Sequence, residues 1–115
     1  MNEAFWQMLD DLVREHEIMI DRPKGSRHPR YPQIVYLLDY GYLKGTSSMD
    51  GGGIDLWLGS KQERRTEAII CTVDKIKGDS EIKLLIGCTE EEMEIAYEFH
   101  NDSEYMKGLL IRREK

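Results

Sequence analysis

Long apolar runs, abundant cysteine and an excess of positive charge are all missing from this chain of 115 residues. Without a long apolar run or a signal-peptide pattern, we expect a cytoplasmic protein with no membrane partner. Two cysteines, Cys71 and Cys88, are present but are not spaced as metal ligands, so we expect reduced, buried thiols. The formal net charge of −6 disfavours nucleic acid as a partner.

Hydrophobic spacing divides the chain into a helix, a run of strands and a second helix. Apolar residues three and four positions apart predict a helix over residues 2–16, with Asn2 as its N-cap. A capping box formed by Thr89 and Glu92 predicts a second helix over residues 89–100, followed by a short strand or turn over residues 106–112. Alternating apolar residues predict strands over residues 17–21, 34–43, 53–60, 67–75 and 81–87.

These elements predict a single domain over residues 1–115, of the mainly β or α+β class. We expect residues 17–88 to form a compact, closed, OB-like β-barrel of about five strands. The N-terminal helix would flank this barrel, together with a C-terminal helix and tail over residues 89–115.

The most informative stretch runs from Tyr36 to Asp55. It begins as a tyrosine-rich strand with period two and breaks into a loop of Gly, Thr, Ser and Asp. Asp50 precedes three consecutive glycines and Asp55 follows them, so two carboxylates can converge on a small volume that suits a hard cation. The alternative is a plain β-hairpin, because Asp and Gly are ordinary turn residues.

Two other segments carry charge in a useful pattern. The loop over residues 22–30 holds the densest positive charge of the chain, including Lys24, Arg27 and Arg30, and can clamp phosphate oxygens. In the strand over residues 81–87, Glu81 and Lys83 share one face, which suits a metal beside a phosphate. A solvated basic loop and a surface ion pair are the simpler alternatives.

Together these segments resemble the family I soluble inorganic pyrophosphatases. That family has a Tyr-Pro-x-x-Tyr-Gly-Tyr strand, a Gly/Thr/Ser loop and an Asp-Gly-Asp-Pro-x-Asp motif. The matching positions here are Tyr36, Tyr40, Gly41, Tyr42, Gly45, Thr46, Asp50, Gly51 and Asp55. Residues 21–27 resemble the family's Glu-Ile-Pro-Lys-Gly-Ser-Arg. Its pattern of Asp, a glycine turn and Asp-x-Lys is similar to Asp74, Gly78, Glu81 and Lys83.

The resemblance implies magnesium-dependent hydrolysis of inorganic pyrophosphate, and it is compatible with homo-oligomers. The implied metal ligands are Asp50, Asp55, Asp74 and Glu81. The implied pyrophosphate-binding residues are Lys24, Arg27, Arg30, Tyr36, Tyr40 and Lys83. Asp55, Tyr40 and Lys24 are expected to be catalytic, and Asp55 would be the ligand nearest the nucleophilic water.

Gly52 stands where the family has the middle aspartate of its triad, which is implicated in activating that water. We therefore expect slow hydrolysis. Two alternatives stay open from the sequence: hydrolysis of another small phosphorylated compound, and non-catalytic binding of phosphates or of a protein partner.

Overall fold

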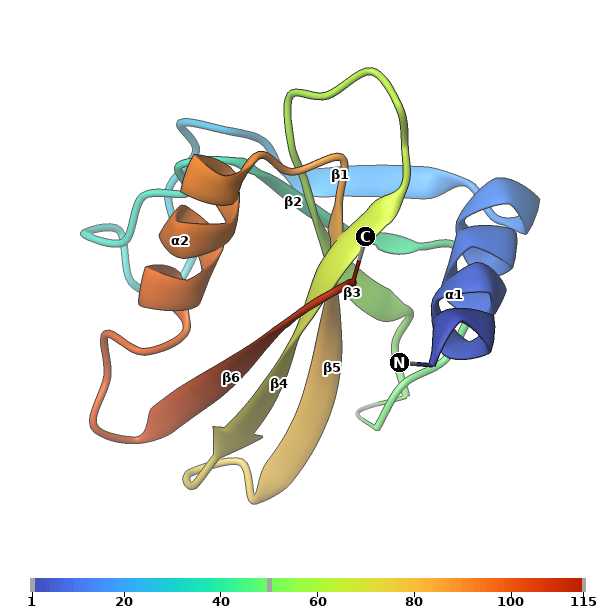
Figure 1. Ribbon diagram of the computed structural model, residues 1–115. Coiled ribbons are helices and arrows are strands. Elements are labelled where there is room, and N and C mark those ends of the chain that lie inside the picture. The colour runs from blue at the N-terminus through green and yellow to red at the C-terminus, as the bar shows by residue number, and fades with distance from the viewer. Residues whose placement is uncertain (1, 50, 115) are drawn as a thin grey trace.

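The computed structural model describes residues 2–49 and 51–114, which form two helices and a six-stranded sheet (Figure 1). The helices are α1 (Glu3–Glu15) and α2 (Glu90–Phe99). The strands are β1 (Ile18–Arg22), β2 (Asp39–Leu43), β3 (Ile54–Leu58), β4 (Thr66–Asp74), β5 (Asp79–Ile86) and β6 (Met106–Arg112). They lie in the order β1-β2-β3-β5-β4-β6, and every neighbouring pair is antiparallel except β3 and β5.

The prediction of a closed barrel is wrong. β1 and β6 lie at the two ends of the strand order, and the described residues show no pairing between them. β6 comes after α2 in the chain and pairs with β4, so it extends the sheet at one edge and does not join the other. The sheet is therefore an open, OB-like one. The mixed class and the two helices are as predicted.

The predicted strand over residues 34–43 is shorter than expected and begins only at Asp39. The residues before it turn back on the preceding loop, where Gly25 N–H donates to the carbonyl of Tyr36 and Tyr36 N–H donates to the carbonyl of Ser26. These bonds occupy backbone groups that a longer β2 would have offered to β1 and β3. Within β2, Gly41 has no room for a side chain, because a Cβ there would collide with the carbonyl of Met19 on β1.

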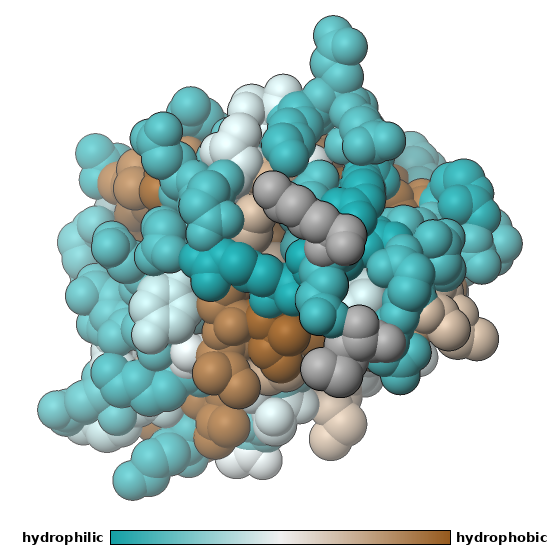
Figure 2. Space-filling model, viewed as in Figure 1, coloured by the Kyte–Doolittle hydropathy of each residue, from teal (hydrophilic) through white to brown (hydrophobic). Residues whose placement is uncertain are grey.

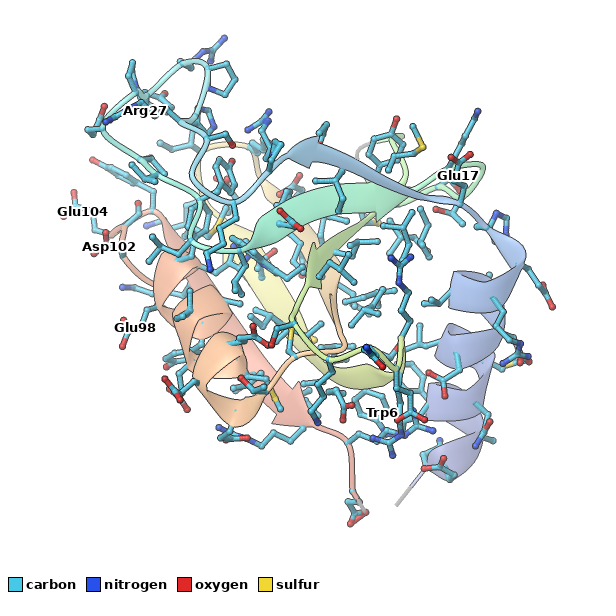
Figure 3. All side chains as sticks on the ribbon, turned by 90° about the horizontal axis from the view of Figure 1, so that it is seen from above. Trp6, Glu17, Arg27, Glu98, Asp102 and Glu104 are labelled. Atoms are coloured by element: carbon cyan, nitrogen blue, oxygen red, sulfur yellow. The ribbon has the colours of Figure 1, made fainter. Side chains whose placement is uncertain are left out.

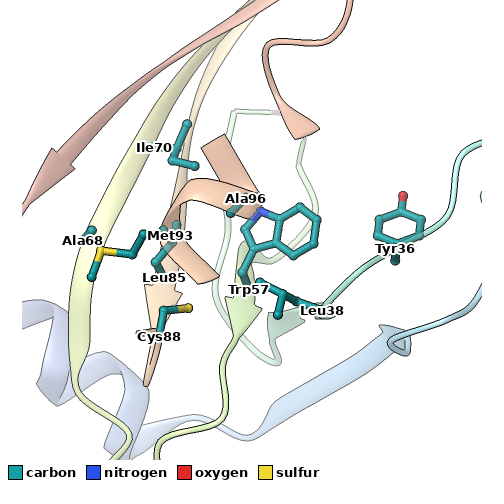
Figure 4. Close-up of a cluster of buried hydrophobic side chains, with 9 residues drawn as sticks. All are labelled: Tyr36, Leu38, Trp57, Ala68, Ile70, Leu85, Cys88, Met93 and Ala96. Atoms are coloured by element: carbon teal, nitrogen blue, oxygen red, sulfur yellow. The ribbon is translucent and has the colours of Figure 1, made fainter. Parts of the chain in front are cut away.

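Each face of the sheet carries one helix and one apolar cluster. On the first face, Trp6 and Val13 of α1 pack against leucine and isoleucine side chains of β2 to β5. On the second face, Met93 and Ala96 of α2 pack against a cluster that includes Trp57 of β3 (Figure 4). This second face, called the α2 face below, carries the candidate site.

Local signals set both helices as predicted. The Asn2 side chain accepts from the backbone N–H of Phe5 at the start of α1. Thr89 and Glu92 form the reciprocal capping box of α2. At the far end of the chain, the buried Arg113 binds Asp10 and Glu3 of α1, which ties that helix to the end of β6.

The face that carries α1 is covered only in part. Figure 2 shows an apolar area over the strands β4 to β6, and Val73, Ile82, Leu109 and Ile111 on those strands are exposed. Both cysteines are free thiols: Cys88 is buried as predicted, whereas Cys71 is only half-buried. In the described part of the chain, neither helix has the length and apolar character needed to cross a membrane.

Candidate functional site

Strand pairing brings the central polar residues of the α2 face together. Tyr40 on β2 pairs with Trp57 on β3, and Asp55 precedes Trp57 by two residues, so Tyr40 and Asp55 are diagonal neighbours on one face. β5 runs parallel to β3 with Leu84 opposite Leu56, which sets Lys83 beside Asp55. Period two along β5 then places Glu81 on the same face as Lys83.

The result is a compact cluster of Asp55, Lys83 and Glu81, called the charged cluster below. Lys83 Nζ lies 2.9 Å from Asp55 Oδ2 and 2.7 Å from Glu81 Oε1. The Tyr40 hydroxyl donates to the same Asp55 Oδ2 at 2.8 Å. The side chains of Lys83 and Glu81 are only 8% and 6% exposed, and that of Asp55 is 27% exposed. This arrangement is an internal ion-pair network and not the surface pair that the sequence allowed as an alternative.

The protonation states follow from these contacts. Burial acts to lower the pKa of Lys83, but the charge of Asp55 and the hydrogen bonds to Glu81 and Asp55 outweigh it, so the pKa is raised. Burial, reinforced by the charge of Asp55, raises the pKa of Tyr40 well above its ordinary value. Lys83 therefore stays a cation and Tyr40 stays a hydroxyl donor at neutral pH.

Asp55 and Lys83 of the charged cluster line a large groove on the α2 face, with a volume of about 1430 Å³, whereas the buried Glu81 does not line it. Of the residues predicted from the sequence, the groove is lined by Arg30, Tyr36, Tyr40, Asp55, Asp74 and Lys83. Arg22 also lines it. It belonged to the basic loop predicted to clamp phosphate, but it was not among the named binding residues. Its guanidinium donates to the Tyr36 hydroxyl at 2.8 Å, and its place in that loop is the sequence signal that could have identified it.

Lys24 and Arg27 do not line the groove, although both were predicted to bind phosphate. The basic loop folds back on itself, and the Arg27 guanidinium donates to the carbonyl of Pro32 at 2.9 Å. Figure 3 shows Arg27 at the outer end of this loop. Lys24 uses its backbone N–H to bind the Asp39 carboxylate, and its side chain is exposed. The fold thus leaves these two cations outside the groove.

The three predicted metal ligands that the structure describes, Asp55, Asp74 and Glu81, are not grouped around one point. Asp50 lies outside the described residues. Asp74 lines the groove, but its Oδ1 accepts from the backbone N–H groups of Ile76 and Lys77 and so caps the turn between β4 and β5. Across residues 2–49 and 51–114, no three His, Cys, Asp or Glu side chains are grouped to hold a metal ion.

A smaller donor set does suit magnesium. Glu81 Oε2 is buried and has no hydrogen-bond partner among the described residues, so it is an oxygen that a cation would satisfy. Magnesium is commonly held by one or two carboxylates together with substrate phosphates and water. Asp55 and Glu81 fit that mode of binding. The ammonium of Lys83 now occupies both carboxylates, so the ion would have to bind together with an anion to which Lys83 can pair instead.

Sequence reasoning missed a buried pair of rings beside the charged cluster. The Trp57 indole N–H donates to His100 Nε2 at 3.0 Å, and His100 is 3% exposed. Burial, together with the charge of Lys83, lowers the pKa of His100 to about 3, so the imidazole is neutral. Because Nε2 accepts, the hydrogen of the ring is on Nδ1. The two residues are 43 positions apart, and no local pattern links them.

The comparisons with known proteins support the fold. No family model and no curated protein sequence matches the chain. A crystal structure of an inorganic pyrophosphatase from Neisseria gonorrhoeae is similar with a TM-score of 0.63 and 16% identity, over 78% of this chain and 77% of that chain. An inorganic pyrophosphatase from Helicobacter pylori is similar with a TM-score of 0.60 and 15% identity, over 84% of this chain and 83% of that chain. The chain therefore has a fold like that of the bacterial inorganic pyrophosphatases, with its sheet left open.

Proposed function

We propose that this protein hydrolyses inorganic pyrophosphate with magnesium, and that it does so slowly. One observation carries the proposal: Asp55 and Lys83 line a groove that Arg22 and Arg30 also line, and Glu81 binds Lys83 from beneath the groove surface, where it is buried. Carboxylates beside cations are what a metal and a transferring phosphoryl group require together. The likeness to pyrophosphatase structures favours pyrophosphate among phosphorylated substrates.

The chain's own residues would bind and orient the substrate. Arg22, Arg30 and Lys83 offer charge to the phosphate oxygens, and Arg22 can do so as a planar fork. Tyr40 keeps its proton because of its raised pKa, so it can donate a hydrogen bond but cannot act as a general base near neutral pH. The Tyr36 hydroxyl accepts from Arg22 and can donate its own hydrogen to a phosphate.

Asp55 and Glu81 are the residues that would hold magnesium, which would neutralise phosphate oxygens and lower the pKa of an attacking water. Asp74 and Asp50 stay predicted ligands. Lys83 binds both Asp55 and Glu81 before substrate binds and offsets one of their two negative charges, and its ammonium can then turn to the phosphate. The slow rate follows from Gly52, because no carboxylate at that position can accept the proton of the water.

A second function is phosphate binding without hydrolysis. The observation in its favour is that Lys83 already occupies both carboxylates of the charged cluster. In that case Arg22 and Arg30 would hold the anion, the charged cluster would keep its ion pairs, and magnesium would have no role. A homo-oligomeric state is a prediction from the sequence in either case.

Phosphate release from pyrophosphate, measured with and without magnesium, separates these functions. We expect release only with magnesium, and we expect Asp55→Asn to abolish it while the protein stays folded, because the amide keeps the shape and loses the charge. Asp11→Asn is the matched control, because Asp11 lies on α1 and does not line the groove. This variant should release phosphate like the natural protein. A natural protein that binds imidodiphosphate but releases no phosphate at any magnesium concentration would establish the second function instead.

A further inference from the structure

The groove is larger than inorganic pyrophosphate requires. Its volume of about 1430 Å³ exceeds the ~300–1,000 Å³ of typical sites for drug-sized organic ligands. Asp55, Lys83 and the arginines Arg22 and Arg30 account for only a small part of its lining. The rest is lined by side chains with no obvious role toward a small inorganic anion.

Three tyrosines stand out in that remaining part and are called the aromatic rim below. Tyr31, Tyr97 and Tyr105 all line the groove and are 48%, 36% and 50% exposed. They come from three separate segments: the loop before β2, the helix α2 and the loop before β6. Exposed aromatic side chains that line one groove mark a binding surface for an apolar group, and flat rings suit stacking on another flat ring.

Charged side chains of both signs also line the groove. Arg22, Arg30, Lys77 and Lys83 supply cations for a diphosphate. Glu98 and Asp102, at the end of α2 in Figure 3, also line the groove and can accept from hydroxyl or amino groups. A long nucleic-acid strand is disfavoured because the whole chain carries a net charge of −6. A single diphosphate unit carries far fewer negative charges than a long strand, so its repulsion from the chain is smaller.

We infer that the groove binds a diphosphate joined to a planar aromatic ring, the chemistry of a nucleoside diphosphate, with the ring on the aromatic rim. The inference rests on the proposed function, because the same cations and the charged cluster would hold the diphosphate. It names a further substrate class for the same site. The P–O–P bond of such a compound is the same kind of bond as that of pyrophosphate, so the same chemistry would apply to it. A stacked base typically adds about tenfold or more in affinity.

The test compares two non-hydrolysable ligands by calorimetry on the full chain, with magnesium present and absent. α,β-Methylene-ADP carries the ring, and methylenediphosphonate has only the diphosphate part. We expect the nucleotide to bind about tenfold more tightly. We expect Tyr105→Ala and Tyr31→Ala each to weaken nucleotide binding by roughly three- to tenfold, with methylenediphosphonate binding unchanged.

Phe5→Ala is the matched control, because Phe5 is an aromatic residue, 38% exposed, on α1 and outside the groove. It should change neither affinity, and circular dichroism should show all variants folded. Equal affinity for the two ligands, no binding of either, or equal losses for both in the tyrosine variants would overturn the inference. If the natural protein prefers the nucleotide but releases no phosphate from pyrophosphate, the proposed hydrolysis fails and the inference stands.

Discussion

Replacing Lys83 by methionine removes the ammonium that binds both Asp55 and Glu81, while the length and much of the volume of the side chain are kept. We expect Lys83→Met to destabilise the protein strongly in the absence of magnesium. We also expect magnesium to restore part of the loss, because a divalent cation can neutralise the two carboxylates that Lys83 has left.

The size of the effect follows from burial. Removing one partner of a buried ion pair typically costs ~3–5 kcal/mol. Glu81 is 6% exposed and Asp55 is 27% exposed at the side chain, so solvent screens Asp55 and the lower value of about 3 kcal/mol is appropriate. At about 4 °C for each kcal/mol, the melting temperature should fall by roughly 12 °C. Magnesium at 100 times its dissociation constant would return about 2.7 kcal/mol.

Thermal unfolding with and without magnesium measures both parts of this prediction. Lys44→Met is the matched control, since Lys44 is exposed and lies outside the groove. It should melt close to the natural protein in both conditions. The reasoning is refuted if Lys83→Met melts with the control, or if magnesium raises its melting temperature no more than that of the natural protein.

Two further predictions concern Gly52 and His100. Gly52→Asp should raise magnesium-dependent phosphate release by ~10²-fold or more, because the new carboxylate can act as a general base. The backbone should accept the aspartate, since Gly52 is not among the glycines found at positive φ. A natural protein that already turns over rapidly would contradict the expectation. For His100, the unfolded state takes up a proton near pH 6.5, whereas the native pKa is about 3. Stability should therefore fall by about 1.4 kcal/mol for each pH unit as the pH drops from 6.5 toward 3. Urea unfolding at pH 7 and pH 5 measures this slope, which should be shallower in His100→Gln.

Local patterns predicted most elements because their physical causes are local. The capping box of Thr89 and Glu92 needs only residues three positions apart, and it begins α2 as expected. Period two along residues 81–87 predicted β5 and its two faces. The strand over residues 34–43 failed because hydrogen bonds between Tyr36 and the loop at Gly25 and Ser26 compete with strand pairing, and the sequence pattern contains no sign of them.

The candidate site was predictable where it depends on strand alternation, and not where it depends on loops or on distant contacts. Glu81 and Lys83 share a face by period two, and the motif resemblance added Asp55 beside them. Lys24 and Arg27 have the right chemistry, but their loop turns back on itself and keeps them out of the groove. His100 approaches Trp57 only because α2 packs on the sheet, which no spacing in the sequence records.

The groove reaches both edge strands of the open sheet. Arg22 ends β1, Met106 begins β6, and both line the groove, so the groove extends between the two edge strands that a closed barrel would have joined. β6 pairs with β4 and does not reach β1, and its preceding loop instead brings Tyr105 to the groove. The departure from the predicted fold thus accompanies a groove that is large enough for the ligand inferred above.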